Sequence, residues 1–443
     1  MRTSIVVMAT VAGVVGLPCA SAAGFIDDSK ASLGLRNFYF NQDYRSSKTA
    51  PSKAEEWGQG FILNFQSGYT QGPVGFGLDA LGLLGVKLDS GGRTDKAGRS
   101  RSPGQLFPLD HDNSVVDHFG SLGLTGKLRI SRTEARIGTL QPRLPVVVFN
   151  DGRLLPQTYE GGQITSAEFA NLTLIGGMLE HAKGRASTDR QALSVPGNLT
   201  RRSNKFYYGG ADYRVGKHLL LQYYYATLED FYEQHFFGLT HTLALPAGSL
   251  TSDLRYFHSE PDGDNASAAG RADGYTIADA RLANDPEKGE VDSRLWSALF
   301  TYRLGGHALG LGYQQNEGDS YLPHLNQSDG ATSYTIATRQ IGGFSRAGER
   351  VLGATYGYDF AALGIPGLSA RVIYNKAWHI DVAGRSRTDR EWERDLRLDY
   401  VVQSGPLKGL GIAWANASLR SDVASQRDID ENRLILLYSI SLR

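Results

Sequence analysis

Residues 74–80 read Val-Gly-Phe-Gly-Leu-Asp-Ala. Successive side chains of an extended strand point to opposite faces, so Val74, Phe76 and Leu78 share one face. Gly75, Gly77 and Asp79 share the other face. Alternation with a period of two residues predicts a strand that has one apolar face and one polar face.

The same alternation recurs along most of the chain. Leu122, Leu124, Leu128 and Ile130 form an apolar row, and Lys127 and Arg129 lie on the opposite face. Ala135 and Ile137 continue the row on the next predicted strand, where Arg136 points to the polar face. Other predicted apolar rows are Phe61, Leu63, Phe65 and Tyr69; Leu84, Val86 and Leu88; Trp296, Ala298, Phe300, Tyr302 and Leu304; Leu309, Leu311 and Tyr313; Leu368, Ala370, Val372 and Tyr374; Leu396, Leu398, Tyr400 and Val402; and Leu434, Leu436, Tyr438, Ile440 and Leu442.

The first 23 residues differ from the rest of the chain. Residues 5–17 are apolar or small, they follow Arg2, and they lead into Cys19-Ala20-Ser21-Ala22-Ala23. This order of a positive charge, an apolar run and small residues is typical of a secretory signal peptide. We therefore expect a signal peptide over residues 1–23 and one domain over residues 24–443.

An exported chain of alternating strands can cross a membrane only as a closed barrel, because lipid offers no partner to an open backbone edge. The mean hydropathy of −0.30 argues against a bundle of membrane-spanning helices. Polar stretches at 89–118, 142–165, 258–292, 317–346 and 381–392 alternate with short turns. The sequence predicts an all-β fold, a transmembrane antiparallel β-barrel with short turns at one rim and long loops at the other. The apolar rows, including the row that ends at Tyr69, would face outward to lipid, and the polar faces would line the lumen.

Composition excludes several classes of function. The formal net charge is zero, which does not favour a nucleic-acid partner. The single cysteine, Cys19, lies in the predicted signal peptide, so we expect no disulfide and no thiol chemistry. No catalytic or metal-binding motif is readable, so we expect no enzyme, no cofactor and no metal. An outer-membrane enzyme and a plugged structural barrel remain weaker alternatives.

Several segments resemble one family. They are Gly24-Phe25-Ile26-Asp27-Asp28-Ser29, Leu35-Arg36-Asn37-Phe38-Tyr39-Phe40-Asn41, the run 67–80 from Ser67-Gly68-Tyr69 to Leu78-Asp79-Ala80, Gln141-Pro142, Asn150-Asp151-Gly152-Arg153-Leu154-Leu155-Pro156-Gln157-Thr158, and Tyr400-Val401-Val402-Gln403-Ser404-Gly405-Pro406. From residue 24 to the C-terminus, the chain resembles the OprD family of outer-membrane porins, also called outer-membrane carboxylate channels.

The resemblance implies a barrel of about 18 strands that works as a monomeric pore in the bacterial outer membrane, alone or in a loose trimer. It also implies a third loop, residues 142–163, that folds inward. Substrates would be small carboxylates guided by basic residues on the lumen face. The partners would be these solutes and the lipid and lipopolysaccharide of the outer membrane.

The alternation and the resemblance together give candidate substrate-binding residues. Lys127, Arg129 and Arg136 follow from alternation, and Arg36, Arg371 and Arg397 follow next. The resemblance adds Arg153 in the inward loop, Asp319 on the opposite, negative side of the constriction, and Arg420. Any single arginine of this set could instead pair with a carboxylate of the wall, such as Asp79, Glu134 or Asp399, and Arg153 could pair with Asp151.

Two classes of substrate are compatible with the sequence. The form Asn-Asp-Gly-Arg-Leu-Leu-Pro at 150–156 more closely resembles the branch that takes up cyclic or aromatic carboxylates. The alternative is a channel for basic amino acids and small peptides, in which acidic residues such as Asp319 would dominate the constriction. One departure from the family is the last residue, Arg443, where outer-membrane barrels usually end in an aromatic or apolar residue.

Overall fold

The computed structural model describes residues 23–45, 52–91, 104–198, 200–277, 289–326, 329–330, 332–381, 388–423 and 426–443. The predicted signal peptide lies outside these ranges apart from Ala23. Among the described residues, no helix is long and apolar enough to cross a membrane.

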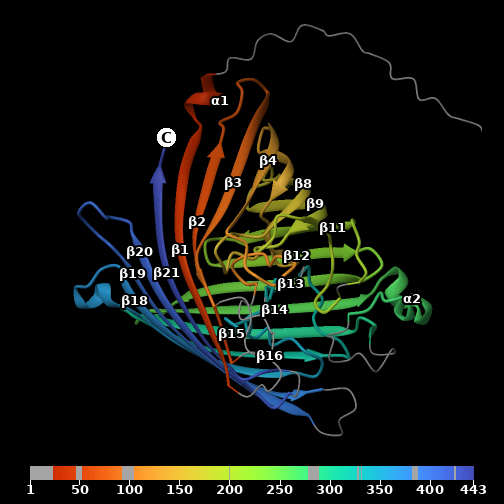
Figure 1. Cartoon of the computed structure of the whole chain (residues 1–443). Helices are drawn as coiled ribbons and strands as arrows, with labels where there is room; N and C mark the ends of the chain where they lie inside the picture. The colour runs from red at the N-terminus through yellow and green to blue at the C-terminus, as the bar shows by residue number, and fades with distance from the viewer. Residues whose placement is uncertain are drawn as a thin grey trace, which may run out of the picture.

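The described strands form one closed antiparallel barrel of 18 strands. Each barrel strand pairs with the next, and β1 pairs with β21, so the first and last strands lie side by side (Figure 1). The barrel strands are β1 (Lys30–Tyr44), β2 (Lys53–Gln66), β3 (Val74–Ser90), β4 (His118–Ile130), β5 (Thr133–Leu140), β8 (Thr158–Ser166), β9 (Leu172–Lys183), β11 (Phe206–Val215), β12 (Leu219–Leu228), β13 (Tyr232–Ala244), β14 (Ser249–Pro261), β15 (Ser293–Leu304), β16 (His307–Glu317), β17 (Arg350–Asp359), β18 (Leu368–Ile380), β19 (Asp389–Val401), β20 (Gly411–Ser421) and β21 (Ile429–Ser441).

The remaining described elements are short and lie in the connections. They are α1 (Ala23–Asp27), the hairpin of β6 (Arg143–Leu144) and β7 (Val147–Val148), β10 (Arg190–Ala192), η1 (Gly263–Ala266), α2 (Ala268–Ala272) and η4 (Phe360–Leu363). The β6–β7 hairpin belongs to the third long loop, and β10 extends the sheet beside β9.

The two faces of the strands have the predicted chemistry. Leu122 and Leu124 of β4 and Ile137 of β5 are exposed on the outer face. Phe300 of β15 and Leu311 of β16 are exposed on it as well. Residues directly opposite one another share a face, and the register places Lys127 opposite Arg136. Arg371 likewise lies opposite Arg397. The predicted apolar exterior and charged lumen are therefore confirmed.

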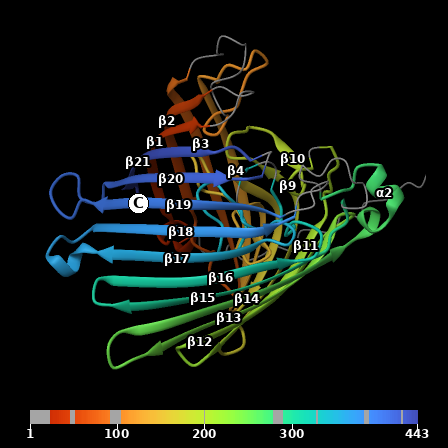
Figure 2. The same cartoon turned by 90° about the horizontal axis from the view of Figure 1, so that it is seen from below.

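Short turns, α1 and the C-terminus lie at one rim (Figure 1), and α2 lies at the other (Figure 2). The short rim includes residues 131–132, 216–218 and 305–306. The predicted loop 142–165 is too long, because β8 begins at Thr158 and carries the backbone ladder to Ser166. The alternation rule also missed the long connection 184–205.

The prediction that Tyr69 faces outward is wrong. Strand β2 ends at Gln66, so the period of two residues does not extend to position 69. The Tyr69 hydroxyl instead donates a hydrogen bond to Glu134 on the lumen face. Its ring lies 4.1 Å from the guanidinium carbon of Arg129.

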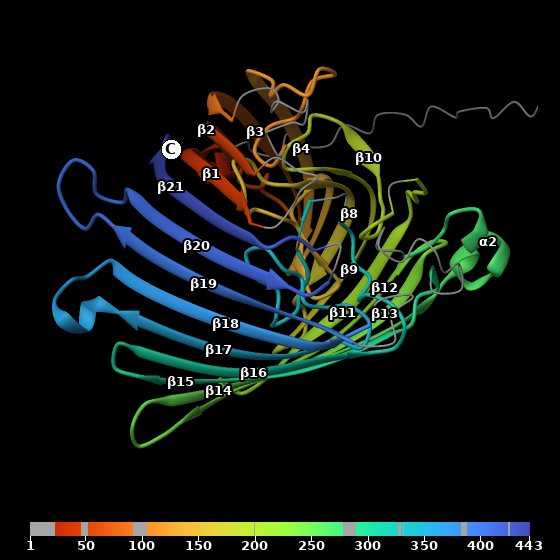
Figure 3. The same cartoon turned by 60° about the horizontal axis from the view of Figure 1, so that its bottom comes forward.

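Much of the buried apolar core lies inside the barrel, beneath the long loops. Phe107 and Leu154, from two different loops, pack in one cluster with Phe38 and Phe40 of the β1 wall. The wall makes room for them with glycine, since a Cβ on Gly58 would lie 2.5 Å from the Phe107 ring. Loop 318–349, in turquoise, also lies within the ring of strands (Figure 3).

A charge on the lipid face should destabilise the barrel, and the same charge on the lumen face should not. We expect Ile137→Lys to lower the free energy of unfolding by about 2 kcal/mol in a bilayer, because lipid cannot solvate an ammonium group. Thr165→Lys is the control, because Thr165 faces the lumen opposite Glu134. Urea unfolding of both variants in lipid vesicles measures the difference. An equal loss in the two variants would contradict the assignment of faces.

Candidate functional site

Strands β3–β5 carry a charged group on the lumen face. The Lys127 Nζ lies 2.6 Å from an Asp79 oxygen, and an Arg136 Nη lies 3.6 Å from the other Asp79 oxygen. The Arg136 Nε also donates to Glu134 at 2.5 Å. The side chain of Lys127 is only 5% exposed. Lys127 therefore holds the wall together, and Arg136 shares its charge between two carboxylates.

Arg129 differs from these two neighbours. Its side chain is exposed, and it is supported by the ring of Tyr69 rather than by a carboxylate. Among the described residues, it has no ion pair. An aromatic ring supports a guanidinium without neutralising its charge, so Arg129 can offer its charge and its donors to a solute.

A cavity of about 740 Å³ lies on the lumen side of β15–β19. Glycine and other small residues form much of its wall, including Gly310, Gly312, Gly353 and Gly357. The charged groups that line it are four guanidinium groups and two carboxylates, from Arg303, Arg339, Arg371, Arg397, Asp359 and Asp399. The cavity therefore carries an excess of positive charge.

The four guanidinium groups of this cavity differ in how many of their donors are already used by protein partners. Arg397 Nη2 pairs with Asp399 at 2.7 Å, and Arg339 donates to two backbone carbonyls of its own loop and to Asn375. Arg303 and Arg371 are exposed, and their side chains form no ion pair or hydrogen bond among the residues that the structure describes. These two side chains keep all their donors for a solute.

The inward loop 141–157 is fastened to the wall by Arg36. The Arg36 Nη1 donates to Asp151 at 2.8 Å and to the carbonyl oxygen of Arg153 at 2.7 Å. The alternative pairing of Arg153 with Asp151 is therefore not what the structure has. Arg36 holds the loop in place, and Asp151 is its carboxylate partner.

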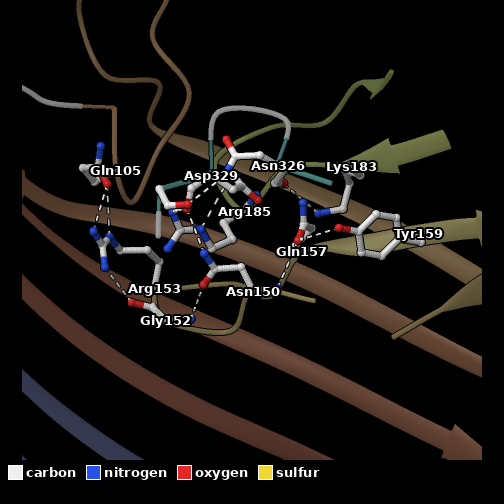
Figure 4. A network of polar contacts seen from close by, with 12 residues as sticks. Gln105, Asn150, Gly152, Arg153, Gln157, Tyr159, Lys183, Arg185, Asn326 and Asp329 are labelled. Carbon is white, nitrogen blue, oxygen red and sulfur yellow. Dashed lines mark hydrogen bonds and ion pairs between the residues drawn. The ribbon is translucent and has the colours of Figure 1, made fainter. Parts of the chain in front are cut away.

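Arg153, Arg185 and Asp329 come from three loops and meet inside the barrel (Figure 4). The Asp329 carboxylate accepts from the backbone N–H of Arg185 at 3.1 Å, and its carbonyl accepts from Asn150 Nδ2 at 2.7 Å. The Arg153 guanidinium donates to Gln105 of a fourth loop at 3.0 Å. Burial raises the pKa of the Asp329 carboxyl, and Arg185 opposes this shift. This network ties the loops that narrow the lumen to one another.

Asp319 does not occupy this position. It is exposed at the start of loop 318–349, directly after β16, and next to Ser320, whose N–H donates to the carbonyl of Asp292. The carboxylate that the structure places among the cations of the inward loops is Asp329. Sequence reasoning missed it because a residue inside a long loop has no periodic pattern to reveal its direction.

The expectation that Arg420 lines the lumen is wrong. It lies directly opposite Trp392 on the neighbouring strand, and Trp392 stacks on Tyr374 of the outer face. The Arg420 Nη2 pairs with Asp430 at 2.8 Å, and its guanidinium carbon lies 5.8 Å from the Trp392 ring centre. The alternation of β20 therefore turns Arg420 away from the pore.

Two lumen arginines could have been found from the sequence. Arg303 lies between Tyr302 and Leu304 of one predicted apolar row, and Arg433 directly precedes Leu434 of another. The same alternation that gave Arg371 therefore points both of them inward. The structure confirms these directions, with Arg303 in the large cavity and Arg433 paired with Glu431 at 2.5 Å.

A closed barrel of this size leaves an aqueous channel. Here the exterior is apolar, the lumen is charged, and the loops at one rim fold inward and narrow the passage. These features define the class: an outer-membrane porin, a channel for small solutes.

The comparisons with known proteins agree. Residues 23–442 match the family model described as outer membrane porin, OprD family. The porin-like protein GalP of Pseudomonas putida is 39% identical over 444 residues, which cover 100% of this chain and 99% of the relative. The chain belongs to the OprD family of outer-membrane porins.

Solved structures of Pseudomonas aeruginosa porins have the same fold. OccK8 (OprE) is 52% identical with a TM-score of 0.85, over 95% of this chain and 100% of that one. OpdK, solved with vanillate, is 36% identical with a TM-score of 0.82, over 94% of this chain and 100% of that one. The matched family and its neighbours are porins, and this chain is an outer-membrane channel for the uptake of small solutes.

Removing the Asp329 carboxylate should loosen the inward loops. We expect Asp329→Ala to destabilise their packing by about 3 kcal/mol, because Arg185 then stays buried without its partner. Faster protease cleavage within loop 184–205 and a noisier single-channel current would measure this. Asp319→Ala is the matched control, since that carboxylate is exposed. Equal effects of the two substitutions would refute the role given to Asp329.

Proposed function

We propose that this porin takes up small carboxylates, above all cyclic or aromatic ones, guided by basic residues of the lumen. The observation that carries the proposal is the large cavity, in which four guanidinium groups face two carboxylates. A carboxylate that enters a narrow pore loses part of its water, and charge-assisted donors must replace that water. Arg303 and Arg371 have donors available for this.

The guiding residues would lie on two walls of the lumen. Arg129 and Arg136 belong to β4 and β5, and Arg371 and Arg397 belong to β18 and β19, far away in the strand order. A solute that passes between these walls meets a donor on either side. A solute that binds weakly at several successive sites can enter the pore and still leave it, whereas one tight site would trap it. Lys127, Arg36 and Arg153 would act indirectly, by fixing the wall and the inward loop.

Two further observations support the proposal. Vanillate, which was bound in the structure of the related OpdK, is an aromatic carboxylate. The family match begins at residue 23, which supports our proposal that residues 1–23 are removed as a signal peptide during export.

Uptake of benzoate and arginine into liposomes, through the refolded protein and side by side, tests the substrate class. Faster uptake of benzoate is the expected result. Faster uptake of arginine would overturn the carboxylate assignment and favour the alternative, a channel for basic amino acids and small peptides. The fold and the family would stand in either case.

Arg129 and Arg371, one on each wall, are two of the lumen cations that have no carboxylate partner among the described residues, and their loss should slow carboxylate uptake. We expect Arg129→Gln with Arg371→Gln to slow benzoate uptake roughly tenfold, because hydrogen bonds to charged groups contribute more than neutral ones. Uptake of a neutral sugar of similar size should change little. The control is Lys217→Gln with Lys408→Gln, which removes two charges from exposed turns at the short-turn rim. An equal loss for both solutes would indicate a folding defect and contradict the proposal.

A further inference from the structure

Four basic residues surround one tryptophan on the outer face of β18–β20, near the long-loop rim. Lys376 lies directly opposite Trp392, and Trp392 lies directly opposite Arg420. Arg390 and Arg394 lie two residues to either side of Trp392 on the same strand, and therefore on the same face. We call Lys376, Arg390, Arg394 and Arg420, with Trp392, the outer basic cluster.

The outer basic cluster faces away from the pore. The residues between its members on β19, Glu391 and Glu393, point into the lumen, where both contact loop 318–349. The outer face next to the cluster is apolar: Leu352 lies directly opposite Lys376 and is exposed, and so is Leu398 farther along β19. A solute in the channel therefore cannot reach these four cations.

The outer basic cluster lies at the height of the membrane surface. Tyr374 stacks on Trp392 with ring centres 5.9 Å apart, and Trp378 continues the outer face of β18 towards the long-loop rim. Tryptophan and tyrosine gather at the boundary between the hydrocarbon and the headgroups. Short turns mark the periplasmic rim of such barrels and long loops mark the extracellular rim, so the cluster lies in the outer leaflet.

Most of the charge in the cluster is available. Lys376 and Arg390 are exposed and, within the described ranges, form no ion pair or hydrogen bond through their side chains. Arg394 donates to the neutral side chains of Asn416 and Ser418. Among the residues that the structure describes, the one carboxylate paired with the cluster is Asp430, which Arg420 shares with Arg45. Four cations and one shared carboxylate leave an excess of positive charge beside lipid.

We propose that the outer basic cluster binds the phosphate groups of the outer-leaflet glycolipid, lipopolysaccharide. Guanidinium groups match phosphate oxygens in charge and geometry, and an ammonium group adds a mobile point charge. The acyl chains of the same lipid molecule would lie against Leu352 and Leu398. A bound lipid with its headgroup at Trp392 satisfies both the charge and the apolar surface directly below it.

Binding of purified lipopolysaccharide to the refolded full-length protein in detergent tests the proposal. We expect Lys376→Gln with Arg390→Gln to raise the Kd roughly 25-fold, since each cation at an anionic membrane surface contributes a factor of about five. Lipopolysaccharide freed of its phosphates should bind the unaltered protein about as weakly. The charge-matched control, Lys217→Gln with Lys408→Gln, lies at the opposite rim and should bind like the unaltered protein.

Three results would overturn the proposal. They are equal binding by the two double variants, binding that does not depend on the phosphates of the lipid, and equally tight binding of inorganic phosphate alone. Single-channel conductance of the Lys376→Gln, Arg390→Gln variant provides the folding control. It should equal that of the unaltered protein, because neither side chain faces the lumen. This result does not depend on which solute the channel carries.

Discussion

The structure depends on one constraint: no backbone hydrogen-bonding group can face lipid without a partner. An open sheet would expose the N–H and C=O groups of β1 and β21 to the membrane, and the pairing of these two strands removes both edges. Closure then fixes the side-chain directions all round the barrel, because every residue opposite a lumen residue also faces the lumen. The alternation that predicts the strands is therefore the same property that sorts the arginines into lumen and lipid sides.

That property explains how much could be predicted from the sequence. The fold, the outer face of Ile137 and the inward direction of Arg129, Arg136, Arg371 and Arg397 all follow from a period of two residues. Arg420 is a lumen candidate only by resemblance, because the sequence pattern near it is ambiguous, and the strand register turns it outward. Tyr69 was assigned by continuing a row past the end of its strand. In both errors, the local backbone geometry decided the position of the side chain.

The loops lie beyond the reach of periodicity. Asp329 and Arg185 are far apart in the sequence, and neither belongs to an alternating segment. Their meeting depends on how two connections fold into a lumen of a given width. Arg153 lies in the inward loop, as predicted, and is buried there. Its guanidinium group donates to the carbonyl of Gly152 in the same loop and to Gln105 in another loop. No sequence pattern predicts that these two loops meet.

An 18-stranded barrel is wide, so selectivity needs loops that stay inside it, and these loops bring unpaired backbone N–H groups with them. Carboxylates of the barrel wall accept hydrogen bonds from these N–H groups. Glu56 accepts from Gln105 and Leu106 at 2.9 Å, and Glu393 accepts from Ile341 and Gly342 at 2.8 and 2.7 Å. These carboxylates are buried and committed to structure, whereas Arg303 and Arg371 stay exposed. A chain with equal numbers of acidic and basic residues can thus present mainly bases to a solute in this part of the lumen, because anchoring the loops uses carboxylates.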